Sequence, residues 1–255
     1  EHLRGDGDLS KVPNLVYRQD GVVKVNRPFA KEELNALPTP DFDGLPLDLY
    51  LSPERVLPVM GSRGCYWEKC AFCSIPFDHM TFHVRYAENV VNDFKTLQAK
   101  YNCNNFFFTD EALPINFLRT FAAKIIEQKV DVQWTGELKF EKSLLKDDRM
   151  DLLYKSGCRK LIFGLESYNQ RVLDSMKKGV ELSWVDETAE RCMQLGIAMH
   201  FYLICGFPTE TREEVMDSIN FVLNNQRLLD SPGFSAILSQ FDLERGAPIE
   251  KTPME

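Results

Sequence analysis

The sequence predicts an α/β fold, a partial (β/α)6 TIM-like barrel preceded by an N-terminal hairpin and an extended proline-rich connector. Three observations support this. Short apolar runs alternate with amphipathic helical patterns about six times after residue 56, prolines cluster before it, and a β-prone pair surrounds a tight-turn dipeptide near the start. At 255 residues the chain is long enough to bury a sizeable core.

The first 55 residues are expected to form a hairpin and linker segment, separate from a core at residues 56–255. The stretch "LVYRQDGVVKV" (15–25) contains two β-prone runs around Asp20-Gly21, a strong signal for a two-residue hairpin turn. Residues 37–58 then carry five prolines, which favour an extended, semi-rigid connector over a packed domain.

The remainder alternates between strand and helix patterns. Strands are expected over residues 56–61, 105–112, 131–138, 160–167, 198–206 and 234–243. Helices are expected over residues 86–101, 117–128, 147–155, 185–196 and 211–225. Repeated βα units imply parallel strands with right-handed crossovers, and six strands are too few for a closed eight-stranded barrel. An open, partial barrel is therefore expected, with its chemistry at the C-terminal ends of the strands.

Composition limits the functional class. The net charge of −8 argues against a surface that coats nucleic acid, and no apolar run is long enough to cross a membrane. Seven cysteines, an odd number with three in one tight cluster, favour metal or redox use in a reducing compartment over a disulfide scaffold. We therefore expect a cytoplasmic protein.

The cluster lies in "GSRGCYWEKCAFCSIP", where Cys65, Cys70 and Cys73 are separated by gaps of four and two residues. Structural zinc needs a fourth ligand, for which His79 or Cys103 could serve. Alternatively, the three thiolates bind three irons of a cluster and leave the fourth iron open to a substrate or cofactor. The spacing favours iron and sulfur over zinc.

This cysteine motif resembles the signature of the radical S-adenosylmethionine (SAM) superfamily, in which the first gap usually has three residues. The four-residue gap resembles a subset of that superfamily. The resemblance implies that Cys65, Cys70 and Cys73 bind a catalytic [4Fe–4S] cluster whose open iron binds SAM. It also implies reductive cleavage of SAM to a 5′-deoxyadenosyl radical, with Phe72 beside the adenine.

Later strand ends carry residues that match SAM-binding positions of the family. "FGLESYNQRVLDSMKKG" resembles the fourth-strand pattern, and "LICGFPTETREE" resembles the fifth-strand motif. Asp110 equally suits a helix cap, and a lone glutamate at a strand end is usually only solvated. The cofactor-binding residues implied by the resemblance are Asp110, Glu111, Glu137, Glu166, Ser167, Lys178 and Tyr202, together with Phe72.

The proline-rich connector resembles the segment that joins a cobalamin-binding domain to a radical SAM core. This resemblance implies cobalamin-assisted methylation of an unactivated carbon in a small molecule or peptide, with a flavodoxin- or ferredoxin-like reductant. The sequence contains no Asp-x-His-x-x-Gly cobalamin motif, so a cobalamin domain would lie upstream of Glu1 or be absent.

Three alternatives remain open. A cobalamin-independent radical SAM enzyme would modify a peptide or metabolite. A methylthiotransferase-like enzyme would modify tRNA, although the acidic chain makes a nucleic-acid partner a poor match. A zinc-stapled binding module would have no catalytic activity, and iron content and SAM cleavage would distinguish it from the three enzyme interpretations.

Overall fold

The computed structural model describes residues 8–26, 33–76 and 81–251 of the chain. It forms two compact units, Glu1–Leu37 and Pro38–Glu255. The predicted zinc ligand His79 lies outside the described residues.

The first unit contains the predicted hairpin. Strands β1 (Val16–Gln19) and β2 (Val22–Val25) pair antiparallel. Asp20 and Gly21 both have positive φ angles, 51° and 77°, as a two-residue turn between twisted strands requires. The hairpin prediction is confirmed. Two short 3₁₀ helices, η1 (Leu9–Lys11) and η2 (Leu34–Ala36), flank it in the chain.

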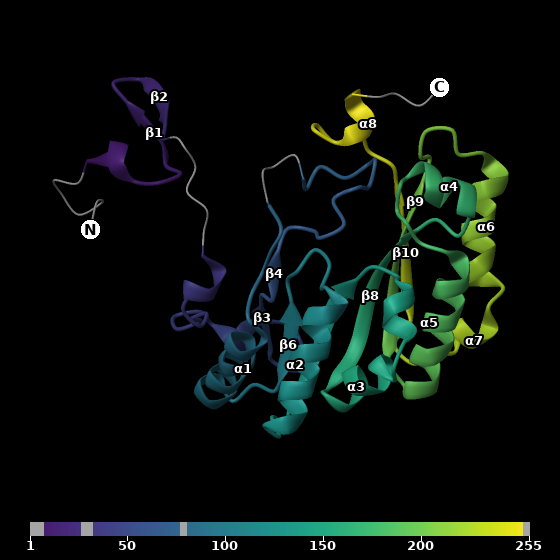
Figure 1. The fold of residues 1–255 in the computed structure, drawn as a ribbon, viewed down its shortest axis with the longest axis horizontal. Coiled ribbons are helices and arrows are strands. Elements are labelled where there is room, and N and C mark those ends of the chain that lie inside the picture. Colours follow the sequence, from purple (N-terminus) through teal and green to yellow (C-terminus); the bar gives the residue numbers. More distant parts are fainter. Residues whose placement is uncertain (1–7, 27–32, 77–80, 252–255) are drawn as a thin grey trace. The chain divides into compact units, whose positions relative to one another are not determined.

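The second unit is built on a six-stranded parallel sheet (Figure 1). The strands are β3 (Val56–Val59), β6 (Asn105–Phe108), β7 (Gln133–Leu138), β8 (Cys158–Glu166), β9 (Ala198–Cys205) and β10 (Ser235–Gln240). They pair in chain order, with neighbours parallel throughout. Because the order never reverses, right-handed crossovers place successive helices on the same face, as in a barrel. The predicted open, partial barrel is confirmed.

The helices lie along the outer face of this sheet (Figure 1). The longer ones are α1 (Ala87–Tyr101), α2 (Ile115–Glu127), α3 (Arg149–Lys155), α5 (Leu182–Leu195) and α6 (Arg212–Leu223). Shorter elements are α4 (Gln170–Ser175), α7 (Gln226–Leu229), α8 (Pro248–Lys251), η3 (Leu47–Leu49) and η4 (Lys142–Leu145). An antiparallel pair, β4 (Ser62–Arg63) with β5 (His83–Val84), was not predicted, because two-residue strands carry no periodic signal. Within the described residues, no helix is long and apolar enough to cross a membrane.

The core fills the space between sheet and helices. Phe106 and Phe108, alternate residues of β6, are buried, and Phe94 of α1 stacks on Phe106 with ring centroids 4.2 Å apart. Trp134 of β7 and Phe121 of α2 complete this aromatic cluster. The opposite face of the sheet is less covered, so Tyr202 of β9 remains 38% exposed. The packed helices therefore leave the inner face available to a ligand.

The proline-rich connector is held against α1 within the second unit. The Phe42 N–H donates to Tyr101 Oη at 2.7 Å, and Lys100 pairs with Asp41 and Asp43 at 2.8 and 2.7 Å. Residues 38–55 thus pack with the barrel. The functional boundary that we expect between residues 55 and 56 stays a prediction.

Candidate active site

A cavity of ≈ 180 Å³ lies at the C-terminal ends of the strands. Cys65, Cys70 and Cys73 all line it. The other predicted site residues on its wall are Phe72, Glu111, Glu137, Glu166, Lys178 and Tyr202. These residues come from five different strand ends or the loops that follow them, so the fold assembles the cavity from distant parts of the sequence.

The cysteine loop is pinned through Ala71, which lies between Cys70 and Cys73. The Ala71 N–H donates to the Met176 carbonyl at 2.8 Å, and the Ala71 carbonyl accepts from the Ile249 N–H at 2.9 Å. Ala71 and Met176 also share a small apolar cluster with Phe207 and Ile249. The loop is therefore fixed between the segment after α4 and helix α8.

The three thiols of this loop are free and half-buried. Burial raises the pKa of Cys70 to about 11 and raises that of Cys73 as well. A metal or cluster that binds here must displace protons from these thiols, because the thiolate is the ligand. Cys103, the other candidate zinc ligand, donates to the Arg55 and Asn105 carbonyls at the opposite end of the sheet and does not line the cavity.

The residues in the four-residue gap hold the loop on a second side. Tyr66 Oη donates to Glu141 Oε1 at 2.7 Å, and Trp67 Nε1 donates to the Lys177 carbonyl at 2.9 Å. Glu68 then takes a left-handed conformation, with φ of 51°. The longer gap thus places an aromatic ring on the cavity wall.

An ion pair between Glu166 and Lys178 forms one wall of the cavity. Their Oε1 and Nζ atoms are 2.6 Å apart, and both side chains are buried. Burial opposes the charge on Lys178, but the Glu166 carboxylate and the Cys70 thiol outweigh it, so the pKa of Lys178 is raised. The ammonium also lies 5.7 Å from the centre of the Phe72 ring. Lys178 therefore keeps its positive charge in the folded protein and brings it into a confined space.

Glu137 adds a titratable carboxyl to the same cavity. Burial, together with the carboxylates of Glu111 and Glu166, raises its pKa to about 7. The charge on this wall therefore changes near neutral pH.

Two predicted site residues do not line the cavity. Asp110 accepts from the Gly61 N–H at 2.9 Å, from the Ser62 N–H, and from Ser62 Oγ at 2.6 Å. Burial raises its pKa to about 6. Ser167 is fully buried, with its Oγ 3.3 Å from Ser218 Oγ. Both side chains are used to fix neighbouring backbone and helix, and their expected contact with SAM stays a prediction.

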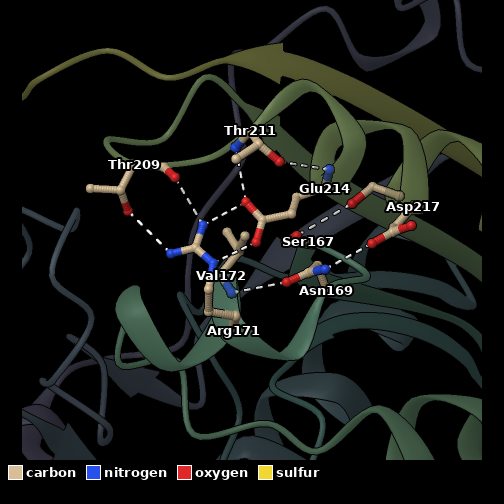
Figure 2. A network of polar contacts seen from close by, with 9 residues as sticks. Ser167, Asn169, Arg171, Val172, Thr209, Thr211, Glu214 and Asp217 are labelled. Carbon is tan, nitrogen blue, oxygen red and sulfur yellow. Dashed lines mark hydrogen bonds and ion pairs between the residues drawn. The ribbon is translucent and has the colours of Figure 1, made fainter.

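The fourth- and fifth-strand motifs are joined by a polar network (Figure 2). Arg171 of α4 pairs with Glu214 of α6 and donates to the Thr209 carbonyl at 2.9 Å. Asn169 donates to Asp217 at 2.7 Å, and Thr211 and Glu214 form a reciprocal capping box at the start of α6. Several polar side chains of these two motifs therefore hold two loops together.

The sequence prediction did not include several residues of the cavity wall. Trp67 and Lys139 line the cavity, and Gly164 lies beneath the Glu166–Lys178 pair. A Cβ on Gly164 would overlap Glu166 Oε1 and come within 2.8 Å of Lys178 Nζ. Two positions in the sequence could have indicated site residues. Trp67 lies in the gap between Cys65 and Cys70, and Lys139 follows a predicted strand in "GELKF".

A second cavity, of ≈ 500 Å³, adjoins the first. The residues on both walls are Phe72, Cys73, Ile75, Glu166 and Tyr202. From there it extends to the end of β10, where Gln240 and Asp242 line it. The adjoining spaces give a ligand room to reach from the cysteines to the last strand.

The donor set fits an iron–sulfur cluster. Three soft thiolates around one cavity match a cluster, in which each cysteine binds a different iron. In the ranges 8–26, 33–76 and 81–251, no group of three or more histidine, cysteine or acidic residues converges on a single metal position. Lys178 and Glu166 line the same cavity as the cysteines and supply groups of both charges for an amino-acid ligand.

These features describe an open parallel α/β barrel with three free cysteines gathered in one cavity at the strand ends, an arrangement that suits a cluster-binding enzyme. The sequence profile of the radical SAM superfamily matches residues 59–222, and the chain belongs to this superfamily.

Relatives of this chain include several methyltransferases. The chain is 28% identical over 224 residues to an uncharacterized methyltransferase of Pyrococcus horikoshii, covering 84% of this chain and 47% of that protein. It is 24% identical over 188 residues to bacteriochlorophyllide d C-12(1)-methyltransferase of Chlorobaculum tepidum, covering 72% and 40%. The chain therefore spans less than half the length of these relatives.

Solved structures show the same fold. The radical SAM methyltransferase TsrM of Kitasatospora setae, solved with tryptophan and a SAM analogue, superposes with a TM-score of 0.70 at 18% identity over 90% of this chain and 46% of that one. The cobalamin-dependent radical SAM enzyme OxsB superposes with a TM-score of 0.71 at 15% identity over 96% of this chain and 41% of that one.

Proposed function

We propose that this chain is the catalytic core of a radical SAM methyltransferase that uses cobalamin to methylate an unactivated carbon. The observation that carries the proposal is the single cavity shared by Cys65, Cys70, Cys73 and the Glu166–Lys178 pair. The methyltransferase relatives support the reaction class.

Each residue has a role in this proposal. Cys65, Cys70 and Cys73 hold a [4Fe–4S] cluster, which together with SAM supplies one-electron cleavage of a carbon–sulfur bond. Lys178 binds the SAM carboxylate as a point charge, and Phe72 packs against the adenine where the two cavities meet. Glu111, Glu137, Glu166 and Tyr202 orient the rest of SAM. Asp110 and Ser167 hold the loops that carry these groups.

The packed walls of the cavity also keep water from the reacting groups. Trp67, Phe72 and Leu138 line it, and Trp67 and Phe72 are only partly exposed. A reactive ligand confined between these side chains meets few competing hydrogen donors.

The remaining partners are inferred from this chemistry. Low-potential reduction requires a one-electron donor, for which a flavodoxin- or ferredoxin-like protein is suitable. The substrate is a small molecule or peptide, and the second cavity at the end of β10 is its entry side or the adenosine site. We place the protein in the cytoplasm, where reducing conditions keep its thiols free.

The test is anaerobic purification of the full-length protein, followed by iron and sulfide counting and reaction with dithionite and SAM. About four irons per chain and formation of 5′-deoxyadenosine are expected. Formation of S-adenosylhomocysteine that depends on added cobalamin supports methyl transfer. Its absence, with 5′-deoxyadenosine still formed, contradicts the methyltransferase assignment. Zinc in place of iron, with SAM left intact, contradicts the enzyme assignment altogether.

A further inference from the structure

Two buried lysines line the cysteine cavity, but their surroundings differ. Lys178 has the carboxylate of Glu166 at 2.6 Å. Lys139, which follows β7 and is 6% exposed, forms no ion pair with any residue in the described part of the chain. Burial of a charge that has no ion-pair partner destabilises the folded protein, so a group that compensates the charge of Lys139 is expected in the cavity.

The contacts of Lys139 fix its position without neutralising it. Its Nζ donates to the Gly179 carbonyl at 2.6 Å and lies 3.4 Å from the Phe140 carbonyl. The same atom lies 4.2 Å from the centre of the Trp67 ring, within range of a cation–π interaction. Carbonyl oxygens and an aromatic face favour a cation but leave its full charge in place.

Trp67 is itself held in one orientation. Its Nε1 donates to the Lys177 carbonyl, and its ring covers Gly179. Gly179 has a φ of +60°, and a Cβ there would overlap the indole ring. A side chain at residue 179 would therefore displace the ring. The Trp67 ring and the Gly179 carbonyl together hold the Lys139 ammonium in place.

The titratable groups that act on this charge are Glu141, Lys178 and the cysteines. Burial lowers the pKa of Lys139, while Glu141 and the thiols of Cys70 and Cys65 raise it. Cys65, Cys70, Trp67 and Lys139 all line the same cavity. A cluster bound by three thiolates is net anionic, so it would place a counter-charge inside the cavity, where Lys139 forms no ion pair with a described residue.

We propose that Lys139 is the built-in counter-charge of the cluster and favours its reduced state, and that Trp67 is the positioning residue that holds Lys139 in place. This inference rests on the proposed function. The step affected is the uptake of one electron from a ferredoxin- or flavodoxin-like donor, which is oxidised in return, and no bond is made or broken. A fixed positive charge nearby favours the more negative product of that step.

The test compares variants of the full-length protein by iron content, thermal unfolding and reductive titration followed by electron paramagnetic resonance. Lys139→Met is expected to load iron as the wild type does, but its midpoint potential shifts to more negative values. At a fixed solution potential, the ratio of reduced to oxidised cluster falls on the order of tenfold. Lys139→Arg keeps the charge and stays near the wild type. Lys142→Met, which removes an exposed charge three residues away, is the matched control and leaves the potential unchanged.

Trp67→Ala provides an independent test, because it removes the ring that positions Lys139 and leaves the lysine charge in place. We expect a smaller shift in the same direction, while Lys69→Met, which removes the exposed cation 4.8 Å from the same ring, has no effect. Full iron loading with an unchanged potential in Lys139→Met overturns the inference. If Lys139→Met does not load iron, an unchanged potential in Trp67→Ala overturns it instead. A wild-type protein without iron overturns the proposed function itself, which is a separate result.

Discussion

Glu166 and Lys178 form a buried ion pair of 2.6 Å across the end of β8, directly above Gly164. The backbone of Glu166 is left-handed there, with φ of 65°. This uncommon conformation ends the strand and turns the carboxylate towards the lysine. Glu166 and Lys178, which the sequence predicts separately as site residues, are thus direct partners in one ion pair.

Removal of one partner should be much worse than removal of both. Lys178→Met leaves the Glu166 carboxylate buried and unpaired, so we expect a loss of about 3 kcal/mol in the free energy of unfolding of the apo-protein. The double variant Glu166→Gln/Lys178→Met should recover most of that loss. Lys177→Met, one residue earlier and exposed, is the control. Denaturant unfolding measures all three, and equal losses in the single and double variants would contradict the pairing.

Gly164→Ala should disturb ligand binding more than folding. The added Cβ would meet the ends of two flexible side chains, Glu166 and Lys178, which can move at modest cost. We expect the melting temperature to change little, while SAM binds about tenfold more weakly because the pair is displaced. Calorimetric titration of the iron-loaded protein with SAM measures the affinity. Wild-type affinity in this variant would show that the pair does not contact SAM.

Asp110 should stabilise the entry to the cysteine loop through its three hydrogen bonds. Asp110→Ala leaves the Gly61 and Ser62 N–H groups without their acceptors, which we expect to cost about 2–4 kcal/mol. Asp110→Asn keeps one carbonyl acceptor and should lose less. Urea unfolding of the apo-protein compares the two. If alanine and asparagine are equally destabilising, the hydrogen bonds to the loop are not the cause.

The pairing of Arg171 with Glu214 should make stability depend on acid pH. The Arg171 hydrogen bond, aided by the Thr211 N–H, lowers the pKa of Glu214 from 4.5 to about 2. Because the folded-state value is depressed, this stabilisation is present above pH 4.5 and is lost as the pH falls towards 2.

Arg171→Gln should therefore destabilise the protein at about pH 6 and have little effect at about pH 2. Arg212→Gln, an exposed arginine at the start of α6, is the matched control. Denaturant unfolding at both pH values measures the difference. A destabilisation that stays the same at both would show that the ionised carboxylate of Glu214 contributes nothing through Arg171.

Local patterns in the sequence were enough to predict most of the architecture. The alternation of apolar runs with helical periodicity specified the six parallel strands, and Asp20-Gly21 specified the hairpin turn. The elements that were missed, such as β4, β5 and α4, are too short to establish a period.

The sequence by itself determined that three cysteines would lie at the end of the first barrel strand, beside acidic and basic residues at later strand ends. Only the tertiary structure decided which of those side chains face the cavity. Asp110 and Glu111 are neighbours in the chain, yet Asp110 turns to the backbone of Gly61 and Ser62 while Glu111 lines the cavity. Likewise, Trp67, Lys139 and Gly179 come from three separate loops. Their contact depends on the packing of the strands that carry those loops, and no local pattern encodes a contact between segments so far apart.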